Sequence, residues 1–304
     1  MCLAAEKKRL KTYLTDFLRE FGYRDEAKLT FGEAFDRLFA DREAFRLFEE
    51  VRTRYEESPD AKPALLIQTA DRLAEKCAIH RYTLYLLLWI LLSESSKKVY
   101  AERHISEEMW RSNMLDLRYW CDHCRLVKGV YGTAWPEWPA RFFAATRFSF
   151  GKLEFETDRF GKNYEEDGVV LRPDDKAIFI HIPRTGEPLR PEDVDASCAA
   201  ASAFFREKFG VKEVVFACHS WILYPENKKL LSEKSNMRSF LSRFDVVDVE
   251  EDTRYKDAWR LFDKDYDGDA DALPQDTSLR RAYAQRIKEH LPLGVALGVW
   301  VYRK

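Results

Sequence analysis

The sequence predicts two domains of different class: an all-helical N-terminal domain over residues 1–140, followed by an α/β domain with a mixed central sheet over 141–304. Apolar residues recur at helical spacing from residue 5 to about 128. Glycine and proline then concentrate between 129 and 145, and strand-like segments separated by helical ones follow. Because single cores tend to stop growing at about 250 residues, a chain of 304 residues has room for two.

The N-terminal half contains amphipathic helical patterns. One is predicted over 35–51 and similar ones over 5–20, 63–93 and 106–127. Ser106, followed by two glutamates, is a good helix N-cap. The longest apolar run, Leu84 to Leu92, has nine residues, well short of the roughly 20 needed to cross a bilayer. We therefore expect a buried helix there, and no membrane partner.

The junction between the two halves is rich in helix breakers and aromatic residues. Gly132, Pro136 and Pro139 end the helical pattern. The aromatic side chains could stack on an adenine or acyl ligand, but such clusters more often cement two domains, which is the interpretation we favour. The cluster consists of Trp120, Tyr131, Trp135, Trp138, Phe142 and Phe143.

The second half contains five predicted strands. In the first predicted strand, the apolar residues change from one alternating phase to the other at Gly151, which predicts a bulge or bend there. Pro191 opens a helix that ends at Gly210 and joins two strands, so those strands should be parallel. The last strand is apolar on both faces and should be central. The predicted strands cover 147–156, 177–183, 214–223, 244–250 and 294–302, with further helices over 224–243 and 276–291.

Composition excludes several classes of protein. Fifty basic and 52 acidic residues nearly cancel, so we expect no nucleic-acid partner. The first residues contain no apolar signal core, and six cysteines, Cys2 among them, are too sparse for a disulfide scaffold. We expect a cytoplasmic protein; the patterns carry no signal for an oligomeric state.

Two histidines are candidates for a general base. His181 lies on one predicted strand and His219 on a neighbouring one, near the ends where parallel strands open. Histidines satisfied by hydrogen bonds within the sheet are the alternative. Ser220 could be an acyl nucleophile, but the G-x-S-x-G elbow is absent and Trp221 follows it directly.

Two motifs resemble metal sites, and we expect a metal at neither. The string from Asp263 to Asp271 has the D-x-D-x-D-G opening of a calcium loop, but Pro274 stands where the closing glutamate belongs. An acidic surface loop explains it. Cys121 and Cys124 have C-x-x-C spacing, and Cys77 with His80 could complete a zinc site. Within helices this spacing also describes small buried core residues.

Several short segments over about 105–304 form a pattern whose order and spacing are more specific than any one segment. They are Leu115 to Leu117, Trp120, Gly129, Phe150 to Phe155, His181 to Pro183, Phe204 and Phe205, Cys218 to Trp221, Pro225, Ser235 and Asn236, Leu273 and Pro274, and Asp276 to Leu279. Together they resemble two-domain acyltransferase-like proteins, which have a helical N-acyltransferase N-terminal domain and a GNAT-like C-terminal domain. The resemblance implies a GNAT-like fold and transfer of an acyl group from acyl-CoA, as co-substrate, to a small-molecule or amine substrate.

The resemblance also implies cofactor-binding residues. A GNAT-like fold seats the pyrophosphate on backbone N–H groups at the start of a helix. The corresponding loop begins with Arg184, Thr185 and Gly186, and Asp276 is a secondary catalytic candidate, with Thr277 and Ser278 beside it. The loop lacks the family's second small residue. Glu187, Glu192 and Asp193 also put negative charge where the pyrophosphate would lie, although Arg184, Arg190 and Lys208 could compensate. The alternative is therefore a non-catalytic binding or scaffold module that retains the GNAT-like fold.

Overall fold

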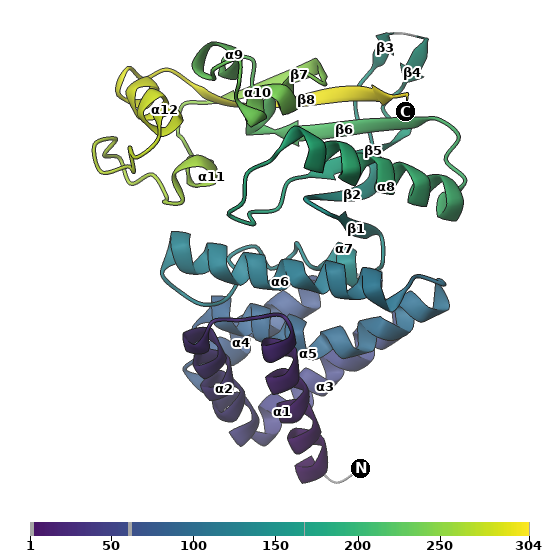
Figure 1. Ribbon diagram of the computed structural model, residues 1–304. Coiled ribbons are helices and arrows are strands. Elements are labelled where there is room, and N and C mark those ends of the chain that lie inside the picture. The colour runs from purple at the N-terminus through teal and green to yellow at the C-terminus, as the bar shows by residue number, and fades with distance from the viewer. Residues whose placement is uncertain (1–2, 60–62, 167, 304) are drawn as a thin grey trace. The chain divides into compact units, whose positions relative to one another are not determined.

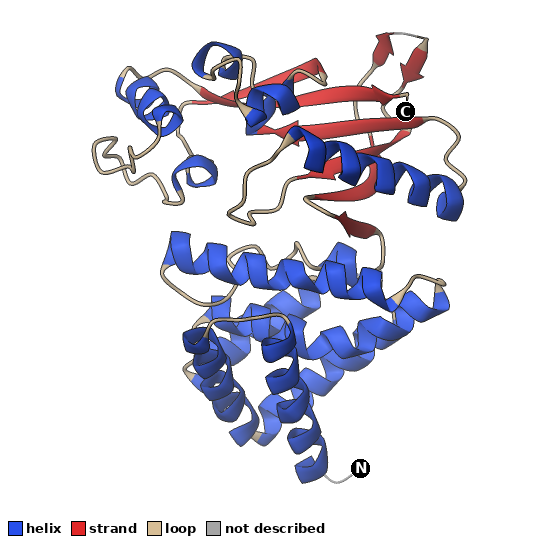
Figure 2. Ribbon diagram, in the orientation of Figure 1, coloured by secondary structure: helices blue, strands red, loops and turns tan. Residues whose placement is uncertain are grey.

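The computed structural model describes residues 3–59, 63–166 and 168–303, and Cys2 lies outside them. The chain divides into two compact units, Met1–Phe148 and Ser149–Lys304 (Figure 1). The first is helical and the second combines a mixed sheet with helices, as predicted (Figure 2). The domain boundary after residue 140 stays a prediction about where the chain would divide on independent folding.

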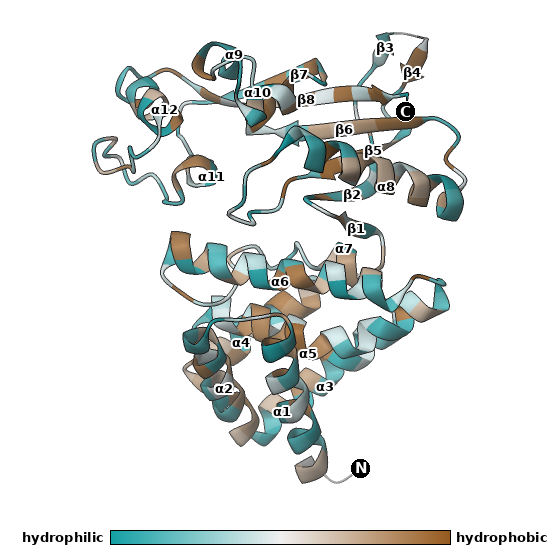
Figure 3. Cartoon of the chain, in the orientation of Figure 1, coloured by the Kyte–Doolittle hydropathy of each residue, from teal (hydrophilic) through white to brown (hydrophobic). Residues whose placement is uncertain are grey.

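The helical unit is built around α5 (Arg81–Glu102). Its apolar run, Leu84 to Leu92, is at most 3% exposed, so the predicted buried helix is confirmed. Figure 3 shows brown, apolar segments on α5. Across the described ranges no helix is both long and apolar enough to span a membrane. The remaining helices of the unit are α1 (Leu3–Glu20), α2 (Asp25–Ala40), α3 (Arg42–Glu57), α4 (Ala64–Cys77), α6 (Glu107–Lys128) and α7 (Ala140–Phe143).

Two segments that the sequence predicts as single helices each form two helices in the structure. The 35–51 pattern is interrupted at Asp41, which is extended and caps α3 by accepting a hydrogen bond from the backbone N of Ala44. The 63–93 pattern is interrupted at Ala78, whose left-handed backbone (φ 51°) ends α4. The apolar spacing continues through both breaks because each pair of helices packs on one core. Ser106 caps α6 as predicted, 3.2 Å from the N of Met109.

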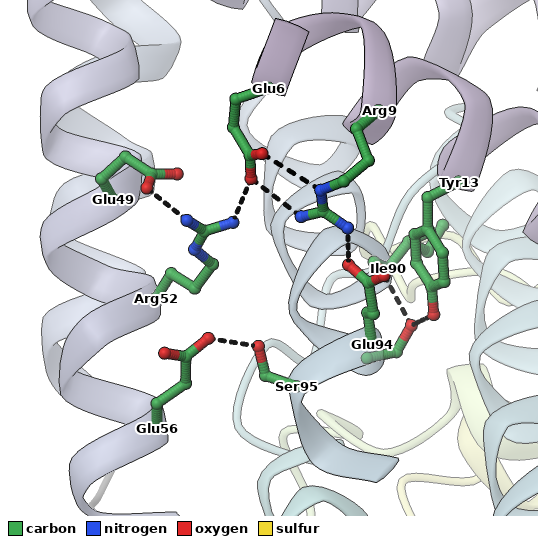
Figure 4. A network of polar contacts seen from close by, with 10 residues as sticks. Glu6, Arg9, Tyr13, Glu49, Arg52, Glu56, Ile90, Glu94 and Ser95 are labelled. Carbon is green, nitrogen blue, oxygen red and sulfur yellow. Dashed lines mark hydrogen bonds and ion pairs between the residues drawn. The ribbon is translucent and has the colours of Figure 1, made fainter. Parts of the chain in front are cut away.

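An ion-pair network centred on the buried Glu6 joins α1, α3 and α5 (Figure 4). Glu6 accepts hydrogen bonds from Arg9 (2.8 Å) and from Arg52 (2.7 Å). Arg9 also pairs with Glu94, and Arg52 with Glu49. Glu6 is 4% exposed, and the hydrogen bond from Arg9, with that from Arg52, lowers its pKa to about 2 against the opposing effect of burial. The network therefore holds α1 on the other two helices.

The junction segment packs on the helical unit. The indole N of Trp89 donates to the carbonyl of Pro136 (2.8 Å), and the N of Thr133 donates to the carbonyl of Tyr82 (3.0 Å). Gly132 lies so close to α5 that a Cβ would be 2.3 Å from the Tyr82 carbonyl group. In the aromatic cluster, the ring of Trp120 on α6 lies 4.8 Å from that of Trp135 and 5.6 Å from that of Trp138. These contacts are all internal to the first unit.

The second unit contains a six-stranded sheet in the order β1-β2-β5-β6-β8-β7. β5 and β6 are parallel and joined by α8 (Pro191–Phe209), as predicted, whereas the pairs β2–β5, β6–β8 and β7–β8 are antiparallel. The interior position of β8 confirms the prediction from its apolar faces. The strands are β1 (Arg147–Phe150), β2 (Leu153–Arg159), β5 (Lys176–His181), β6 (Val214–Ser220), β7 (Asp245–Asp252) and β8 (Leu293–Tyr302).

Three local features of this unit differ from the sequence predictions. The irregularity at Gly151 (φ 59°) is a tight turn between β1 and β2, where a Cβ would be 2.8 Å from the Ser197 hydroxyl. Two three-residue strands, β3 (Tyr164–Glu166) and β4 (Val169–Leu171), form a separate hairpin. The helical stretch after β6 is broken into short pieces. These are the 3₁₀ turn η1 (Trp221–Leu223), α9 (Asn227–Leu230) and α10 (Asn236–Leu241), with α11 (Trp259–Phe262) and α12 (Ser278–Lys288) beyond β7.

Candidate functional site

The two parallel strands of the sheet separate at their carboxyl ends. The register between β5 and β6 contains two pairs, Ile178 with Phe216 and Phe179 with Ala217. β6 nevertheless continues to pair with β8 as far as Ser220. β5 therefore stops pairing with β6 after Phe179, and we call this end of the parallel pairing, where the last residues of the two strands no longer pair, the gap.

His181 and His219 lie on the same face of the sheet beside this gap. Phe179 and Ala217 are register partners, His181 lies two residues after Phe179, and His219 lies two residues after Ala217. Because side chains two residues apart on a strand share a face, both histidines lie on the same face of the sheet. Ser220 is on the opposite face from His219. Its hydroxyl caps η1 by accepting from the N of Ile222 (3.2 Å). That geometry separates Ser220 from the base that a nucleophilic role would need, and the role of each residue stays a prediction.

His181 is hydrogen-bonded to a carboxylate that the sequence reasoning did not single out. Glu154 is the register partner of His181, and Glu156, two residues further on, reaches the ring diagonally. The distance from Nε2 of His181 to Oε1 of Glu156 is 2.7 Å. In the neutral ring this bond favours the tautomer with its proton on Nε2, leaving the lone pair on Nδ1. The sequence did contain a signal for this carboxylate, because the alternation over residues 153–157 places Glu154 and Glu156 on one face of a strand.

His219 is half-exposed and has a more distant carboxylate partner. Its Nε2 lies 3.6 Å from a carboxylate oxygen of Glu250 on β7, and the two side chains are 48% and 68% exposed. Such an exposed contact orients a ring weakly. His181 therefore has the better-defined geometry of the two candidate bases.

The predicted phosphate loop follows β5 directly. Gly186 adopts a left-handed backbone (φ 80°), and the N of Glu187 donates weakly to the Thr185 hydroxyl (3.3 Å). Arg184 forms an ion pair with Asp263 at the start of the acidic loop. Glu187 pairs with Lys152, which neutralises its charge, whereas Glu192 and Asp193 add negative charge in the first turn of α8. The loop leads into α8, whose N-terminus has no side-chain cap.

Asp276 belongs to an ion-pair cluster at the start of α12. It pairs with Arg280 (2.9 Å), and this hydrogen bond lowers the pKa of its carboxyl group. Arg280 also pairs with Asp263, which links Asp276 indirectly to Arg184. Thr277 caps α12 by accepting from the N of Arg280 (3.1 Å). These contacts give Asp276 a structural role, and its catalytic role stays a prediction.

The two metal-like motifs have other partners. In the acidic loop, Asp267 accepts from the N of Asp269 and Asp269 from the N of Asp271, while Asp263 pairs with two arginines. Burial raises the pKa of Cys124 to about 12, which disfavours the thiolate that zinc needs. Within the described residues, no group of three or more His, Cys, Asp or Glu side chains could hold a metal ion.

A mixed sheet whose parallel strands part beside a crossover helix defines a GNAT-like fold, and family comparisons agree. A family model described as the GNAT-like C-terminal domain matches residues 148–300, half of the chain, and one described as the N-acyltransferase N-terminal domain matches residues 12–145. The chain therefore belongs to the family of two-domain proteins that combine these domains. No curated protein sequence gave a significant match.

Solved structures share the fold. One is an acyltransferase in complex with decanoyl-CoA and teicoplanin, with a TM-score of 0.72 and 22% identity, covering 95% of this chain and 87% of that chain. Another is an acyltransferase in complex with CoA and 10C-teicoplanin, with a TM-score of 0.72, 21% identity and the same coverage. A third, an acyltransferase in complex with decanoyl-CoA, has a TM-score of 0.61 and 18% identity over 95% of this chain and 99% of that chain.

Proposed function

We propose that this protein is an acyltransferase that moves an acyl group from acyl-CoA to an amine. The observation that carries the proposal is the His181–Glu156 pair beside the gap where β5 leaves β6. A thioester placed in that gap would lie beside a positioned base. Membership of the family supports acyl transfer, and the decanoyl-CoA complexes of structurally similar proteins support acyl-CoA as the donor.

The proposed step is attack of a neutral amine on the thioester carbonyl carbon. A C–N bond forms and the C–S bond breaks, giving an amide and the thiolate of CoA. Nδ1 of His181 accepts the proton that the amine nitrogen loses, and the departed thiolate takes a proton from solvent. Glu156 holds the ring in the tautomer that leaves Nδ1 able to accept, so we assign it as a positioning residue.

The CoA pyrophosphate would lie against the loop from Arg184 to Gly186 and the start of α8. Backbone N–H groups at a helix N-terminus are suited to bind phosphate, and α8 has no side-chain cap to compete for them. Lys152 offsets the charge of Glu187. The teicoplanin complexes of similar structures support a small-molecule acceptor for this chain as well.

Two measurements test the proposal. First, decanoyl-CoA at a hundred times its dissociation constant should stabilise the wild-type protein by about 2.7 kcal/mol. No stabilisation by any acyl-CoA would favour the non-catalytic binding module instead.

Second, turnover is measured as CoA release with a panel of alkyl amines and amino sugars. His181→Ala should lower it by about 10² to 10⁴, with decanoyl-CoA affinity changed only a few-fold. Glu156→Gln should lower it by about tenfold to a hundredfold, the effect of losing a charge-assisted hydrogen bond. His219→Ala is the matched control. A large loss in the control with full activity in His181→Ala would transfer the base to His219.

A further inference from the structure

The turn between β1 and β2 is fixed on the start of α8. The backbone N of Lys152 donates to the Ser197 hydroxyl (3.0 Å), and that hydroxyl donates to the carbonyl of Asp193 (2.7 Å). Glu154, near the start of β2, is the register partner of His181, the last residue of β5. The turn therefore lies at the edge of the sheet where β5 ends and the loop to α8 begins. Lys152 is placed beside the proposed phosphate loop by contacts of its own backbone.

The ammonium group of Lys152 ends on a carboxylate of that loop. It pairs with Glu187, four residues before Pro191 begins α8. The side chain of Lys152 is 28% exposed, whereas that of Glu187 is 61% exposed. Lys152 is thus the anchored member of the pair, and Glu187 is the member with room to move into solvent. Because a surface ion pair contributes little to stability, another anion can replace Glu187 at small cost.

Cations are scarce where the phosphate loop enters α8. Residues 184–195, which form the loop and the first turns of α8, contain two arginines and four carboxylates. One of the arginines, Arg184, pairs with Asp263, and one of the carboxylates, Asp195, pairs with Arg243. The backbone N–H groups at the helix start favour an anion, but the surplus of carboxylates opposes it. Lys152 therefore supplies a cation that this segment lacks.

We propose that Glu187 is an internal competitor for the cofactor site. Its carboxylate occupies the ammonium group of Lys152 in the free protein, and the pyrophosphate of acyl-CoA displaces it. The inference rests on the proposed binding of acyl-CoA. Carboxylate and phosphate both offer a lysine charged acceptor oxygens, so one can take the place of the other. Lys152 is then a cofactor-binding residue, and its contact with Glu187 is autoinhibitory.

The test is the affinity for CoA, measured by calorimetry. Glu187→Gln should tighten binding by about two- to fivefold, because it removes the competitor and keeps the shape of the side chain. Lys152→Met should weaken binding by about tenfold, because a charge-assisted contact is lost. A pair that merely orders the loop predicts weaker binding in both variants. Unchanged or weaker binding by Glu187→Gln would therefore overturn the proposal.

A double variant separates competition from general repulsion, which would also make Glu187→Gln bind CoA more tightly. In the Lys152→Met background the competitor has nothing to occupy. Glu187→Gln should therefore increase the affinity less in that background than it does when Lys152 is present. Repulsion alone predicts an equal or larger gain there, because Lys152 no longer neutralises Glu187. That result would overturn the proposal.

Lys212→Met and Glu213→Gln are matched controls, because they make the same changes of charge at exposed positions just beyond the other end of α8. α8 has 19 residues, so its ends are about 28 Å apart, well beyond the roughly 8 Å over which physiological salt screens exposed charges. Both controls should leave CoA affinity unchanged. Lys152→Met should weaken binding of 3′-dephospho-CoA as much as that of CoA. A loss of this response would place Lys152 on the 3′-phosphate and overturn the pyrophosphate assignment.

The same titrations distinguish failure of this inference from failure of the proposed function. If the wild type binds CoA and neither variant changes the affinity, the pair is an ordinary surface contact and acyl transfer is left standing. If neither the wild type nor Glu187→Gln binds CoA, the donor assignment is overturned and this inference with it. Binding that is measurable only in Glu187→Gln would support the competitor.

Discussion

Replacing Glu6 with glutamine should destabilise the helical unit by about 2 to 3 kcal/mol at pH 7. The pKa of Glu6 falls from 4.5 to about 2 in the folded protein. A displacement of this size corresponds to about 3 kcal/mol, because each pKa unit is about 1.4 kcal/mol. The full loss of about 3 kcal/mol is not expected, because Arg9 and Arg52 keep Glu94 and Glu49 as partners after Glu6 is replaced.

The same residue makes a prediction about acid stability. Since folding lowers the pKa of Glu6, its contribution is complete above the unfolded pKa of about 4.5. It is lost as the pH falls toward the folded pKa of about 2. The stability difference between wild type and Glu6→Gln should therefore be largest above pH 5 and should shrink steadily between pH 5 and 2.

Amide hydrogen exchange measured peptide by peptide is the suitable assay, because it reports α1 separately from the second unit. Asp16→Asn is the matched control. Asp16 lies on the same helix and pairs with Arg19 at 2.7 Å, but its side chain is 51% exposed, so its loss should have little effect. Equal protection of α1 in wild type and Glu6→Gln, or a difference that does not change with pH, would refute the reasoning.

Three further predictions concern the backbone, the cofactor loop and metal. Gly132→Ala should lower the free energy of unfolding, measured by thermal melts, by about 2 kcal/mol or more, because its Cβ would overlap the Tyr82 carbonyl. Gly32→Ala is the control. Its Cβ would meet only the end of Lys11 at 3.9 Å, so it should be neutral or stabilising. Arg184→Ala should weaken decanoyl-CoA binding about tenfold by calorimetry with little change in turnover at saturation, while Asp263→Asn should not weaken it. Calcium at 1 mM should leave the melting temperature unchanged, and a rise of several degrees that Asp265→Ala abolishes would contradict this.

The helical unit could be predicted because its apolar residues follow the helical period, but its breaks could not. Asp41 and Ala78 interrupt helices whose apolar faces continue on the same core, so the period carries through each break. Asp41 lies between two apolar turns, which is a signal for a helix N-cap. The continuous apolar spacing nevertheless predicted a single helix across it. The left-handed Ala78 has no comparable signal, because alanine favours the helix interior.

The arrangement around the candidate base depends on register, which the sequence does not specify. Alternation shows that Glu154 and Glu156 share a face, and it places His181 on one face of its own strand. It does not show that β2 lies beside β5, since the short β3–β4 hairpin intervenes in the chain. Only the pairing of Glu154 with His181 brings Glu156 to within 2.7 Å of the ring.

The charge of the cofactor loop likewise depends on partners distant in sequence. Glu187 suggests a loop hostile to pyrophosphate, but Lys152, 35 residues earlier, neutralises it. Arg184 pairs with Asp263, which keeps a second partner in Arg280, 15% exposed and bonded also to Asp276. If a pyrophosphate binds Arg184, Asp263 therefore still has the buried guanidinium group of Arg280 beside it. Because a buried carboxylate is costly only when it loses all its partners, Arg184 can change partner at small cost. This is why Asp263→Asn should not weaken decanoyl-CoA binding whereas Arg184→Ala should.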